Sequence, residues 1–428
     1  MKVCVIGGGS TYTPELIDGL LRRRDVLDLH EVHLVDVDAS RLAVLGPLAQ
    51  RMSDGAGVAV HWGTDRRDGI AGSTFVVSQL RAGGMAARER DERLGREFGL
   101  IGQETVGVGG FANALRTIPV ALEIAADIER WAPEATLLNF TNPAGLVTEA
   151  LCRHTDLAAV GLCNVPWSIK ALVARSLDVE AEAVQMDYVG LNHLSWVRAV
   201  TVDGDDRTGE VLARLRERAA RRVARGDAEP DGEPDWTPGA IDTLGAIPNS
   251  YLLYYYETEA WLRHQAAHPT RASAVMEIEE TLLARYADPD LAEKPPELAE
   301  RGGAHYSEAA AALMADLAAD TGAVHVVNTP NRGAIPGLPD DVVVEVSASV
   351  HADRIEPLVV DPLRPDVDAL VRAVKDFELL TVQAAVEGDR DAAIRALVTN
   401  PLGPSINDAP LVWQRLVELN AGQLGALG

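Results

Sequence analysis

The first 165 residues alternate between short apolar runs and longer amphipathic segments. The runs "KVCVIGG" and "EVHLVDVD" are rich in β-branched residues, which is typical of buried parallel strands. The segments between such runs, among them "ALRTIPVALEIAADIERWAP", space their apolar residues as helices do. The alternation predicts an α/β fold in which residues 1–165 form a Rossmann-like, doubly wound sheet.

The pattern changes from residue 166 onward. The stretch "MDYVGLNHLSWVRAVTVDGDDR" predicts an antiparallel hairpin, and we expect glycine at its turn. The stretch "VHVVNTPNRGAIPGLPDDVVVEVSASV" predicts a strand, a loop and a second strand, and the tail from Pro365 has a helical pattern. We therefore predict a second domain of α+β type over residues 166–428.

Composition places the chain among globular proteins. Of its 428 residues 47% are hydrophobic and 24% charged, and no apolar run reaches the roughly 18 residues of a membrane span. The chain begins within a predicted strand, so we expect no signal peptide. The three cysteines, Cys4, Cys152 and Cys163, have no framework spacing, which predicts free thiols and a cytoplasmic location.

The net charge of −25 argues against a nucleic-acid partner, because phosphate backbones would be repelled. It does not exclude a small anionic substrate, provided that a few arginines converge locally. The expected partner is therefore a small molecule.

A glycine-rich loop follows the first predicted strand. Gly7, Gly8 and Gly9 precede a predicted helix, so backbone N–H groups and the helix N-terminus are placed to bind a pyrophosphate. Ser10 adds a hydroxyl that can reach a phosphate. Tyr12 stands where the dinucleotide fingerprint has its third glycine, so the helix and strand are expected to pack less closely.

Asp36 ends the second predicted strand and is placed to accept hydrogen bonds from the adenosine ribose, which favours NAD over NADP. The alternative is a tight turn in an α/β domain that binds no nucleotide.

Polar residues also gather in loops after later strands. These stretches are "NFTNPAG" at 139–145, "GLCNVP" at 161–166, "GLNHLSW" at 190–196 and "IPNSYLLYYY" at 247–256. Cys163 and His193 stand at such sites with polar neighbours, which suggests a pair of metal ligands. Taken singly, each could instead be a buried core residue.

Together with "GGGSTYTPEL", "GQETVGVGG" and "RGGAHYS", these motifs resemble glycoside hydrolase family 4. That family comprises NAD- and manganese-dependent glycosidases, among them 6-phospho-α- and 6-phospho-β-glucosidases. The resemblance runs from Met1 to "ALVTNPLGPS" near the end of the chain. It implies a first domain similar to lactate and malate dehydrogenases. The second domain would bind metal and substrate and assemble a homodimer or homotetramer.

The resemblance also implies the reaction. NAD⁺ would take a hydride from carbon 3 of the sugar, a base would remove the proton from carbon 2, and the glycosidic oxygen would leave by elimination. Water would then add, and the hydride would return. Cys163 and His193 match the two protein ligands of the metal, and Tyr251 matches the base. Softness of the ligands alone would predict zinc, so manganese follows from the resemblance.

Further residues match substrate contacts of the family: Arg88, Asn142 and Arg271. Arginine suits a sugar phosphate by its charge and forked donors, although each arginine could also form a surface ion pair. Gln103 and Glu104 are weaker candidates for orienting sugar hydroxyls or supporting the metal.

Asn164 decides between anomers. In the α-selective branch the residue after the metal cysteine is an aspartate that protonates the leaving group, and asparagine cannot supply that proton. "CNVP" resembles the 6-phospho-β-glucosidase branch, so we expect a β-glycoside or 6-phospho-β-glycoside as substrate. Trp167 departs from the family pattern; in the pocket it would narrow the site or stack on a sugar.

Two other interpretations use the same cofactor loop. A 2-hydroxyacid dehydrogenase of the lactate/malate type would release NADH stoichiometrically, and it would have no use for the pair in "CNVP" and "GLNHL". A non-catalytic, NAD-responsive binding protein would need no combination of Cys163, His193 and Tyr251. A third alternative is a family relative that acts on unphosphorylated glycosides.

Overall fold

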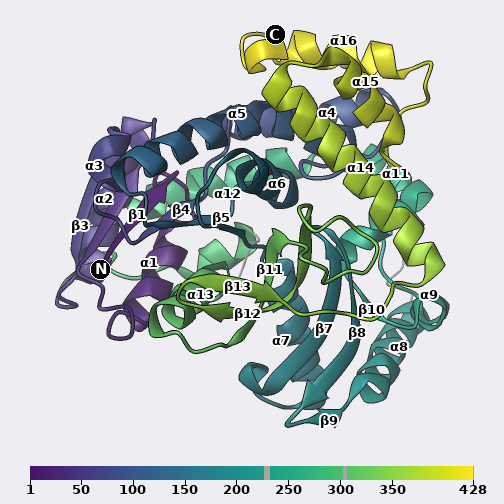
Figure 1. The fold of residues 1–428 in the computed structure, drawn as a ribbon, viewed down its shortest axis with the longest axis horizontal. Helices are drawn as coiled ribbons and strands as arrows, with labels where there is room; N and C mark the ends of the chain where they lie inside the picture. Colours follow the sequence, from purple (N-terminus) through teal and green to yellow (C-terminus); the bar gives the residue numbers. More distant parts are fainter. Residues whose placement is uncertain (226–231, 302–305, 428) are drawn as a thin grey trace.

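A computed structural model describes residues 1–225, 232–301 and 306–427 (Figure 1). Residues 302–305, inside the motif "RGGAHYS", lie outside this described part. Within it, no helix is both long enough and apolar enough to cross a membrane.

One large sheet crosses the molecule. Its parallel strands are β1 (Lys2–Ile6), β2 (Glu31–Val35), β3 (Ala59–Gly63), β4 (Phe75–Ser78), β5 (Thr136–Asn139) and β6 (Ala159–Gly161). They lie in the order β3-β2-β1-β4-β5-β6, which is the doubly wound order of dinucleotide-binding folds. The predicted Rossmann-like sheet is thus confirmed.

Three antiparallel strands from the second half of the chain extend this sheet beyond β6. They are β11 (Val324–Pro330), β12 (Val343–His351) and β13 (Arg354–Pro357). The sheet therefore takes strands from both sides of the boundary predicted at residue 165.

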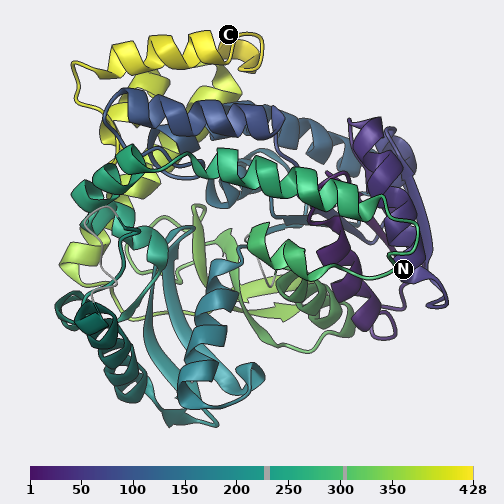
Figure 2. The same ribbon diagram turned by 180° about the vertical axis from the view of Figure 1, so that it is seen from behind.

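Helices cover both faces of the large sheet (Figures 1 and 2). One face packs against α1 (Thr13–Arg22), α2 (Ala39–Ser53) and α13 (Tyr306–Ala319). The other packs against α3 (Arg66–Ile70), α4 (Gly84–Glu97), α5 (Gly107–Trp131), α6 (Ala144–His154) and α14 (Pro365–Glu387). Within β1, Val3 and Val5 enter the first core, whereas Cys4 and Ile6 enter the second. This alternation follows from the two-residue period of a strand.

A second, smaller sheet contains the predicted hairpin. It consists of β7 (Val184–Leu191), β8 (Leu194–Val202), β9 (Asp205–Asp206) and β10 (Ile247–Pro248). Beside it lie α7 (Val165–Leu177), α8 (Thr208–Arg225) and α9 (Pro238–Leu244). After β10 come α10 (Leu253–Tyr256) and α11 (Thr258–Ala267), and then α12 (Arg271–Tyr286), which packs against α4 and α2. β7 packs against β12, so the two sheets meet there.

The glycine expected at the hairpin turn is not there. Leu191 pairs with Leu194, so the turn between β7 and β8 is made by Asn192 and His193. His193 adopts a positive φ of 62°, a conformation that a non-glycine residue seldom takes. Gly204 instead makes the next turn, between β8 and β9. The side chain of His193 therefore stands at the tip of the hairpin.

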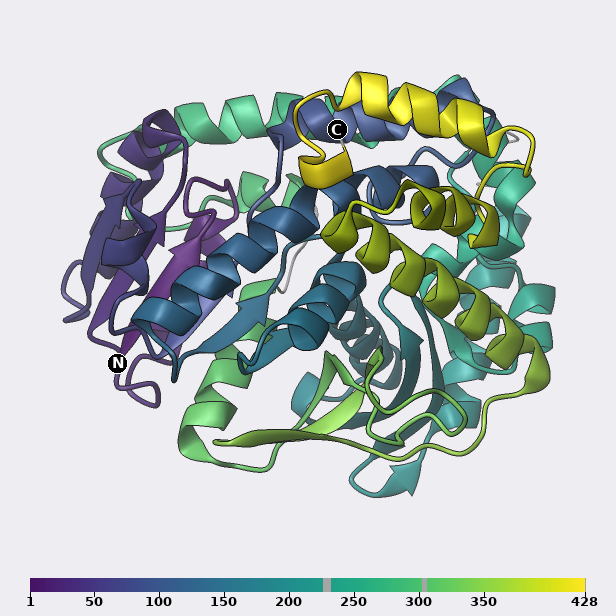
Figure 3. The ribbon, with the colours of Figure 1, turned by 45° about the horizontal axis from the view of Figure 1, so that its top comes forward.

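The tail is helical, as predicted. After α14 come α15 (Arg390–Thr399) and α16 (Ala409–Leu419). Figure 3 shows this C-terminal group, in green to yellow, lying over α4 and α5. The tail thus covers one side of the helices that surround the candidate site.

Candidate active site

One cavity of about 1840 Å³ runs from the glycine loop to the tip of the β7–β8 hairpin. Most of the predicted site residues line it: Gly7, Gly9, Ser10, Asp36, Arg88, Gln103, Glu104, Asn142, Asn164, His193, Tyr251 and Arg271. Gly8 and Cys163 do not line it. The cavity lies at the carboxyl ends of the parallel strands, where open α/β sheets bind ligands.

The glycine loop packs closely on the sheet. The N–H groups of Gly7 and Gly8 both donate to the carbonyl of Val35, at 2.8 and 2.9 Å, and the Gly9 N–H donates to Asp36 Oδ2 at 2.9 Å. These partners lie within the protein, which differs from the prediction that glycine N–H groups are held ready for a pyrophosphate. A Cβ on Gly8 would lie 2.7 Å from Leu34 Cβ. Gly8 therefore permits close packing on β2. A Cβ on Gly7 would lie 2.8 Å from the Gln79 backbone, and one on Gly9 would lie 2.9 Å from Asp36 Oδ2, so these glycines also allow close approach.

Asp36 stands at the end of β2 and at the wall of the cavity, as predicted. Its Oδ2 accepts from Gly9 and its Oδ1 accepts from the Asp38 N–H at 2.9 Å. A carboxylate has about four acceptor sites, so capacity remains for ribose hydroxyls. The arrangement fits an adenosine ribose beside the loop.

Cys163 and His193 come together from two different elements. Cys163 follows β6, His193 forms the hairpin tip, and Sγ lies 3.4 Å from Nε2. The other ring nitrogen, Nδ1, lies 2.9 Å from Thr105 Oγ1, which fixes the orientation of the imidazole. Cys163 and His193 are both buried.

Their protonation states follow from this burial. Burial lowers the pKa of His193 to about 3, so the imidazole is neutral near pH 7. Burial raises the pKa of the Cys163 thiol above its usual range, and the Glu345 carboxylate raises it further. A metal would therefore have to displace the thiol proton when it binds.

The residues fit a divalent metal with open positions. A neutral imidazole nitrogen and a sulfur stand side by side, and the described residues contain no group of three or more His, Cys, Asp or Glu side chains able to hold a metal. A metal here would take two protein ligands, leaving positions for substrate oxygens. Asn142, after β5 at the same edge of the sheet, has a buried Oδ1 for which the described chain provides no hydrogen-bond donor.

Tyr251 lies against Cys163 and His193, the candidate metal ligands, which we call the metal pair. Its ring stacks on the His193 ring, with centroids 3.7 Å apart and planes 8° from parallel. Its backbone N–H donates to Asn249 Oδ1 at 2.9 Å, which begins the short helical turn. Burial raises the pKa of the Tyr251 phenol above its usual range, whereas Arg88 and a hydrogen bond with Thr105 lower it.

The other three tyrosines of the cluster differ in setting, and of them Tyr254 also lines the cavity. Tyr254 touches Tyr251 edge-on at 5.7 Å but packs more closely on Trp261, at 4.6 Å. Tyr255 packs against the core, and Tyr256 is exposed. Tyr251 is thus the tyrosine of this cluster that stacks on His193.

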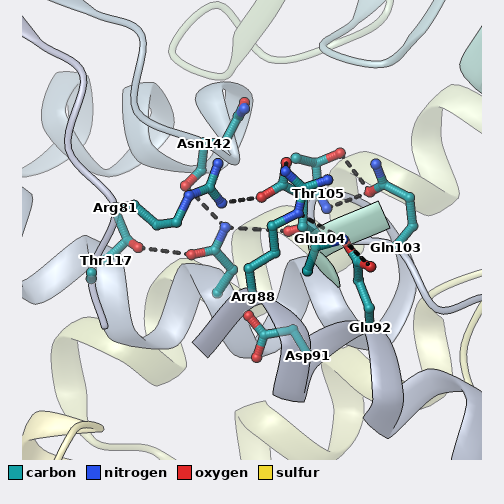
Figure 4. Close-up of polar contacts among 12 residues, drawn as sticks. Arg81, Arg88, Asp91, Glu92, Gln103, Glu104, Thr105, Thr117 and Asn142 are labelled. Carbon is teal, nitrogen blue, oxygen red and sulfur yellow. Dashed lines mark hydrogen bonds and ion pairs between the residues drawn. The ribbon is translucent and has the colours of Figure 1, made fainter. Parts of the chain in front are cut away.

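Two arginines converge on Glu104 (Figure 4), which precedes Thr105, the hydrogen-bond partner of His193. Arg88 pairs with Glu104 at 3.1 Å and with Glu92 at 2.7 Å, and Arg81 also pairs with Glu104. Burial alone would raise the pKa of Glu104, but Arg81 and Arg88 lower it to about 2. The carboxylate is therefore ionised, and it holds both guanidinium groups at the cavity wall.

Sequence reasoning missed Arg81 and Thr105. Arg81 follows β4 at the carboxyl edge of the sheet, a position that could have marked it. Thr105 lies in the quoted motif "GQETVGVGG", but only the fold brings it to His193. Gln103, a weak candidate, uses its Oε1 to accept from Thr105 Oγ1 at 2.7 Å and from the Val106 N–H at 3.2 Å. It thereby supports the start of α5.

The remaining candidates differ in setting. Asn164 lines the cavity at the start of α7, beside Cys163. Arg271 begins α12 and is exposed, with Nη2 donating to the Arg301 carbonyl at 3.1 Å. Trp167 does not line the cavity; the Lys170 ammonium lies 5.6 Å from its ring. Trp167 therefore neither narrows the pocket nor stacks on a ligand there.

Comparison with known proteins gives a consistent result. The model described as "Family 4 glycosyl hydrolase" matches residues 2–179, and "Family 4 glycosyl hydrolase C-terminal domain" matches residues 188–403. A "Probable 6-phospho-beta-glucosidase" of Bacillus subtilis (strain 168) is 41% identical over 99% of this chain and 97% of that protein.

Solved structures agree. The 6-phospho-beta glucosidase of Thermotoga maritima, solved with manganese, NAD+ and glucose-6-phosphate, superposes with a TM-score of 0.91 at 36% identity, covering 98% of each chain. Malate dehydrogenase of Plasmodium falciparum superposes with a TM-score of 0.52 at 14% identity, over 90% of this chain and 99% of that one. The latter likeness concerns the fold alone.

Proposed function

Because this chain belongs to family 4 of the glycosyl hydrolases, we propose that it is a 6-phospho-β-glucosidase that uses NAD⁺ and a divalent metal, with manganese as the metal of its relative. One observation carries the proposal. Cys163 Sγ and His193 Nε2 lie 3.4 Å apart, with the Tyr251 ring stacked on the histidine, in the cavity that also holds the glycine loop.

The two cofactors would supply the chemistry that side chains lack. When bound, NAD⁺ accepts a hydride from carbon 3 of the sugar and later returns it, and the metal acts as a Lewis acid toward the neighbouring oxygens. Cys163 and His193 would hold the metal, with Thr105 orienting the imidazole. The glycine loop and Asp36 would hold the nucleotide.

Tyr251 would remove the proton from carbon 2, which becomes acidic once carbon 3 is a ketone. Its side chain is half-buried at the cavity wall, with its ring stacked on His193, and desolvation keeps the phenol protonated in the free protein, since it raises the pKa. A cation at Cys163 and His193 would favour the phenolate by charge. Arg88 acts in the same direction.

Asn164 supports the choice of a β-glycoside. It lies beside Cys163 at the cavity wall and has no proton to donate to a leaving group. The carboxylates of Glu92 and Glu104 lie near the cavity, but both are paired with Arg88. The arrangement favours elimination over the paired-carboxylate chemistry of most glycosidases.

The two arginines would divide recognition of the substrate. Arg88 is buried, and two carboxylates balance its charge, so it suits sugar hydroxyls. Arg271 lies at the exposed rim, where a 6-phosphate would sit. The homodimer or homotetramer and the cytoplasmic location stay predictions.

The proposal is tested by the cofactor requirement of cleavage. We expect the protein to cleave an aryl 6-phospho-β-glucoside only when NAD⁺ and Mn²⁺ are both present, and to form no net NADH because the hydride returns. The release of the aryl group and the absorbance of NADH are followed together. Cys163→Ser is the matched control, since it should remove metal-dependent activity while NAD⁺ still binds.

One NADH formed per substrate consumed would instead make the protein a dehydrogenase. Equal rates on phosphorylated and unphosphorylated glucosides would show that the enzyme does not require the 6-phosphate, whereas the proposed reaction would still hold.

A further inference from the structure

A chain of buried polar side chains lies behind the metal pair, outside the cavity. It contains Glu345 on β12, Tyr188 on β7, Ser195 on β8 and Asn249 next to β10. These side chains are 0% exposed, and none of them lines the cavity. Burying such a network costs free energy unless every member is hydrogen-bonded, which suggests that the network has a role in holding the site.

Glu345 is the acceptor on which the chain converges. Its Oε1 accepts from Asn192 Nδ2 at 2.9 Å and from Asn328 Nδ2 at 3.1 Å, and its Oε2 accepts from the Tyr188 hydroxyl at 2.9 Å. Three donors from three strands or turns thus point at one carboxylate. Burial raises the pKa of Glu345 to about 7, whereas these three hydrogen bonds favour the ionised form, which accepts from all of them without conflict.

Glu345 differs from the other buried carboxylates in having no cation beside it. Glu149 pairs with Lys375 at 2.9 Å, and Asp91 pairs with Arg116 at 2.5 Å. Within the described residues no Lys, Arg or His forms an ion pair with Glu345. A buried carboxylate without a positive partner is expensive, which points to a role beyond stability.

The first branch from Glu345 leads to the metal ligands. Asn192 donates to Glu345, while its Oδ1 accepts from the Gly145 N–H at 3.3 Å, so the amide is held at both ends. Asn192 directly precedes His193 in the hairpin turn. The carboxylate therefore fixes the residue next to one of the two metal ligands.

The second branch leads to the base. The Tyr188 hydroxyl lies 2.6 Å from Ser195 Oγ, and Asn249 Nδ2 donates to that same oxygen at 2.9 Å. Asn249 Oδ1 in turn accepts from the backbone N–H of Tyr251 at 2.9 Å. Three side chains thus connect Glu345 to the start of the helical turn that carries the base.

We infer that Glu345 is a positioning residue: it holds the metal-ligand turn and the Tyr251 turn in one fixed arrangement, and the bound divalent cation supplies the positive charge that Glu345 lacks. This inference rests on the proposed function, since it requires a metal at Cys163 and His193. It assigns a role to β12, a strand that reaches the site only through its buried face.

The test is the affinity for Mn²⁺ of Glu345→Gln in the full chain, measured by titration of free Mn²⁺ with electron paramagnetic resonance. The glutamine keeps the volume but turns one acceptor into a donor and removes the charge. We expect the affinity to fall by about 10- to 100-fold, the range seen when a supporting partner of a metal ligand is lost. NAD⁺ affinity should stay within about twofold of the wild type.

Glu149→Gln is the matched control. Glu149 is equally buried and also accepts from the Val343 N–H at 2.7 Å, but its partners are Arg153 and Lys375 and not Cys163 or His193. It should lose thermal stability as Glu345→Gln does and yet keep Mn²⁺ affinity within about twofold. Equal losses of affinity in the two variants would show that Glu345 only supports the fold, and would overturn the inference.

Tyr188→Phe separates the two branches, and it decides the question if Glu345→Gln fails to fold. It removes the hydroxyl that joins Glu345 to Ser195, whereas the hydrogen bonds from Asn192 and Asn328 to Glu345 remain. Mn²⁺ affinity should therefore persist while exchange of the carbon 2 proton slows several-fold. Unchanged exchange in Tyr188→Phe would overturn the inference. A wild-type protein that binds no Mn²⁺ would overturn the proposed metal site itself, and this inference with it.

Discussion

Glu104 shows how single charges are balanced around the cavity. It is buried between Arg81 and Arg88; without it Arg88 would keep its ion pair with Glu92, whereas Arg81 pairs with no other carboxylate among the described residues. Removing one partner of a buried ion pair lowers stability more than replacing both partners by apolar residues, because the remaining charge stays buried without a counter-charge. Glu104 therefore stabilises the wall that faces the substrate.

We predict that Glu104→Gln lowers the free energy of unfolding by about 3 kcal/mol at pH 7, measured by urea denaturation. The carboxyl has its pKa lowered to about 2 in the folded chain, from 4.5. Its stabilisation is therefore complete above pH 4.5 and is lost as the pH falls toward 2. The difference between wild type and variant should shrink across that range.

Glu97→Gln is the control for this prediction. Glu97 pairs with Arg415 at 3.1 Å, but both side chains are well exposed, so the loss should stay below about 1 kcal/mol. A Glu104→Gln protein as stable as Glu97→Gln would contradict the charge balance described here.

At this scale the sequence indicated the residues proposed to carry chemistry better than those that support them. Cys163, His193 and Tyr251 could be picked out because they stand in polar motifs that follow strands or cluster tyrosines. Thr105 and Glu345 could not, since a threonine in a loop and a glutamate in an apolar strand have no local pattern. Their partners are 88 and 153 residues away along the chain.

The glycine loop is the element whose packing is most demanding. A Cβ on Gly8 would lie 2.7 Å from Leu34 Cβ and 3.0 Å from Leu34 Cα, and the backbone of β2 cannot easily move away. The loop would have to rise into the space meant for the nucleotide. Gly8 thus allows the loop to approach the backbone of β2 closely. From the sequence alone, a run of glycines does not tell this role from that of offering N–H groups to a ligand.

We predict that Gly8→Ala weakens NAD⁺ binding by about tenfold, since overpacking of this kind costs about 1–3 kcal/mol. Binding is measured by calorimetry, and Mn²⁺ affinity should change little. Gly63→Ala serves as the control because a Cβ there meets no atom within 4 Å. NAD⁺ affinity of Gly8→Ala equal to that of Gly63→Ala would contradict the packing argument.

The β7–β8 hairpin shows where element prediction failed. Alternation of apolar residues identified both strands, but the turn was expected at a glycine. His193 takes the positive φ instead, held by its contacts with Thr105, Cys163 and Tyr251. Tertiary contacts overrode the local preference, and they did so at the site.

At the scale of the whole molecule, one sheet joins the candidate nucleotide site and the candidate metal site. The parallel strands position the glycine loop and Cys163, while β12 in the same sheet carries Glu345 behind the hairpin. The order of helices and strands predicted the Rossmann-like half. It could not predict that strands from after residue 323 extend the same sheet, because pairing over such separations leaves no local signal.

The shared sheet has a consequence for mechanism. Hydride transfer takes place at carbon 3 and proton transfer at carbon 2, and these two carbons are bonded to each other. The nucleotide and Tyr251 must therefore reach the sugar in one cavity. They would do so here, since both Gly9 and Tyr251 line it. Cleavage would then proceed by oxidation at carbon 3 followed by elimination.

The fate of deuterium at carbon 2 of an aryl 6-phospho-β-glucoside tests that claim most directly. We predict that deuterium slows cleavage and is replaced by solvent hydrogen in the glucose 6-phosphate formed, and that Tyr251→Phe abolishes the exchange while NAD⁺ still binds. Tyr256→Phe, whose side chain is 41% exposed, should exchange as the wild type does. Glucose 6-phosphate that retains all of its carbon 2 deuterium would contradict the account, because direct displacement leaves that hydrogen untouched.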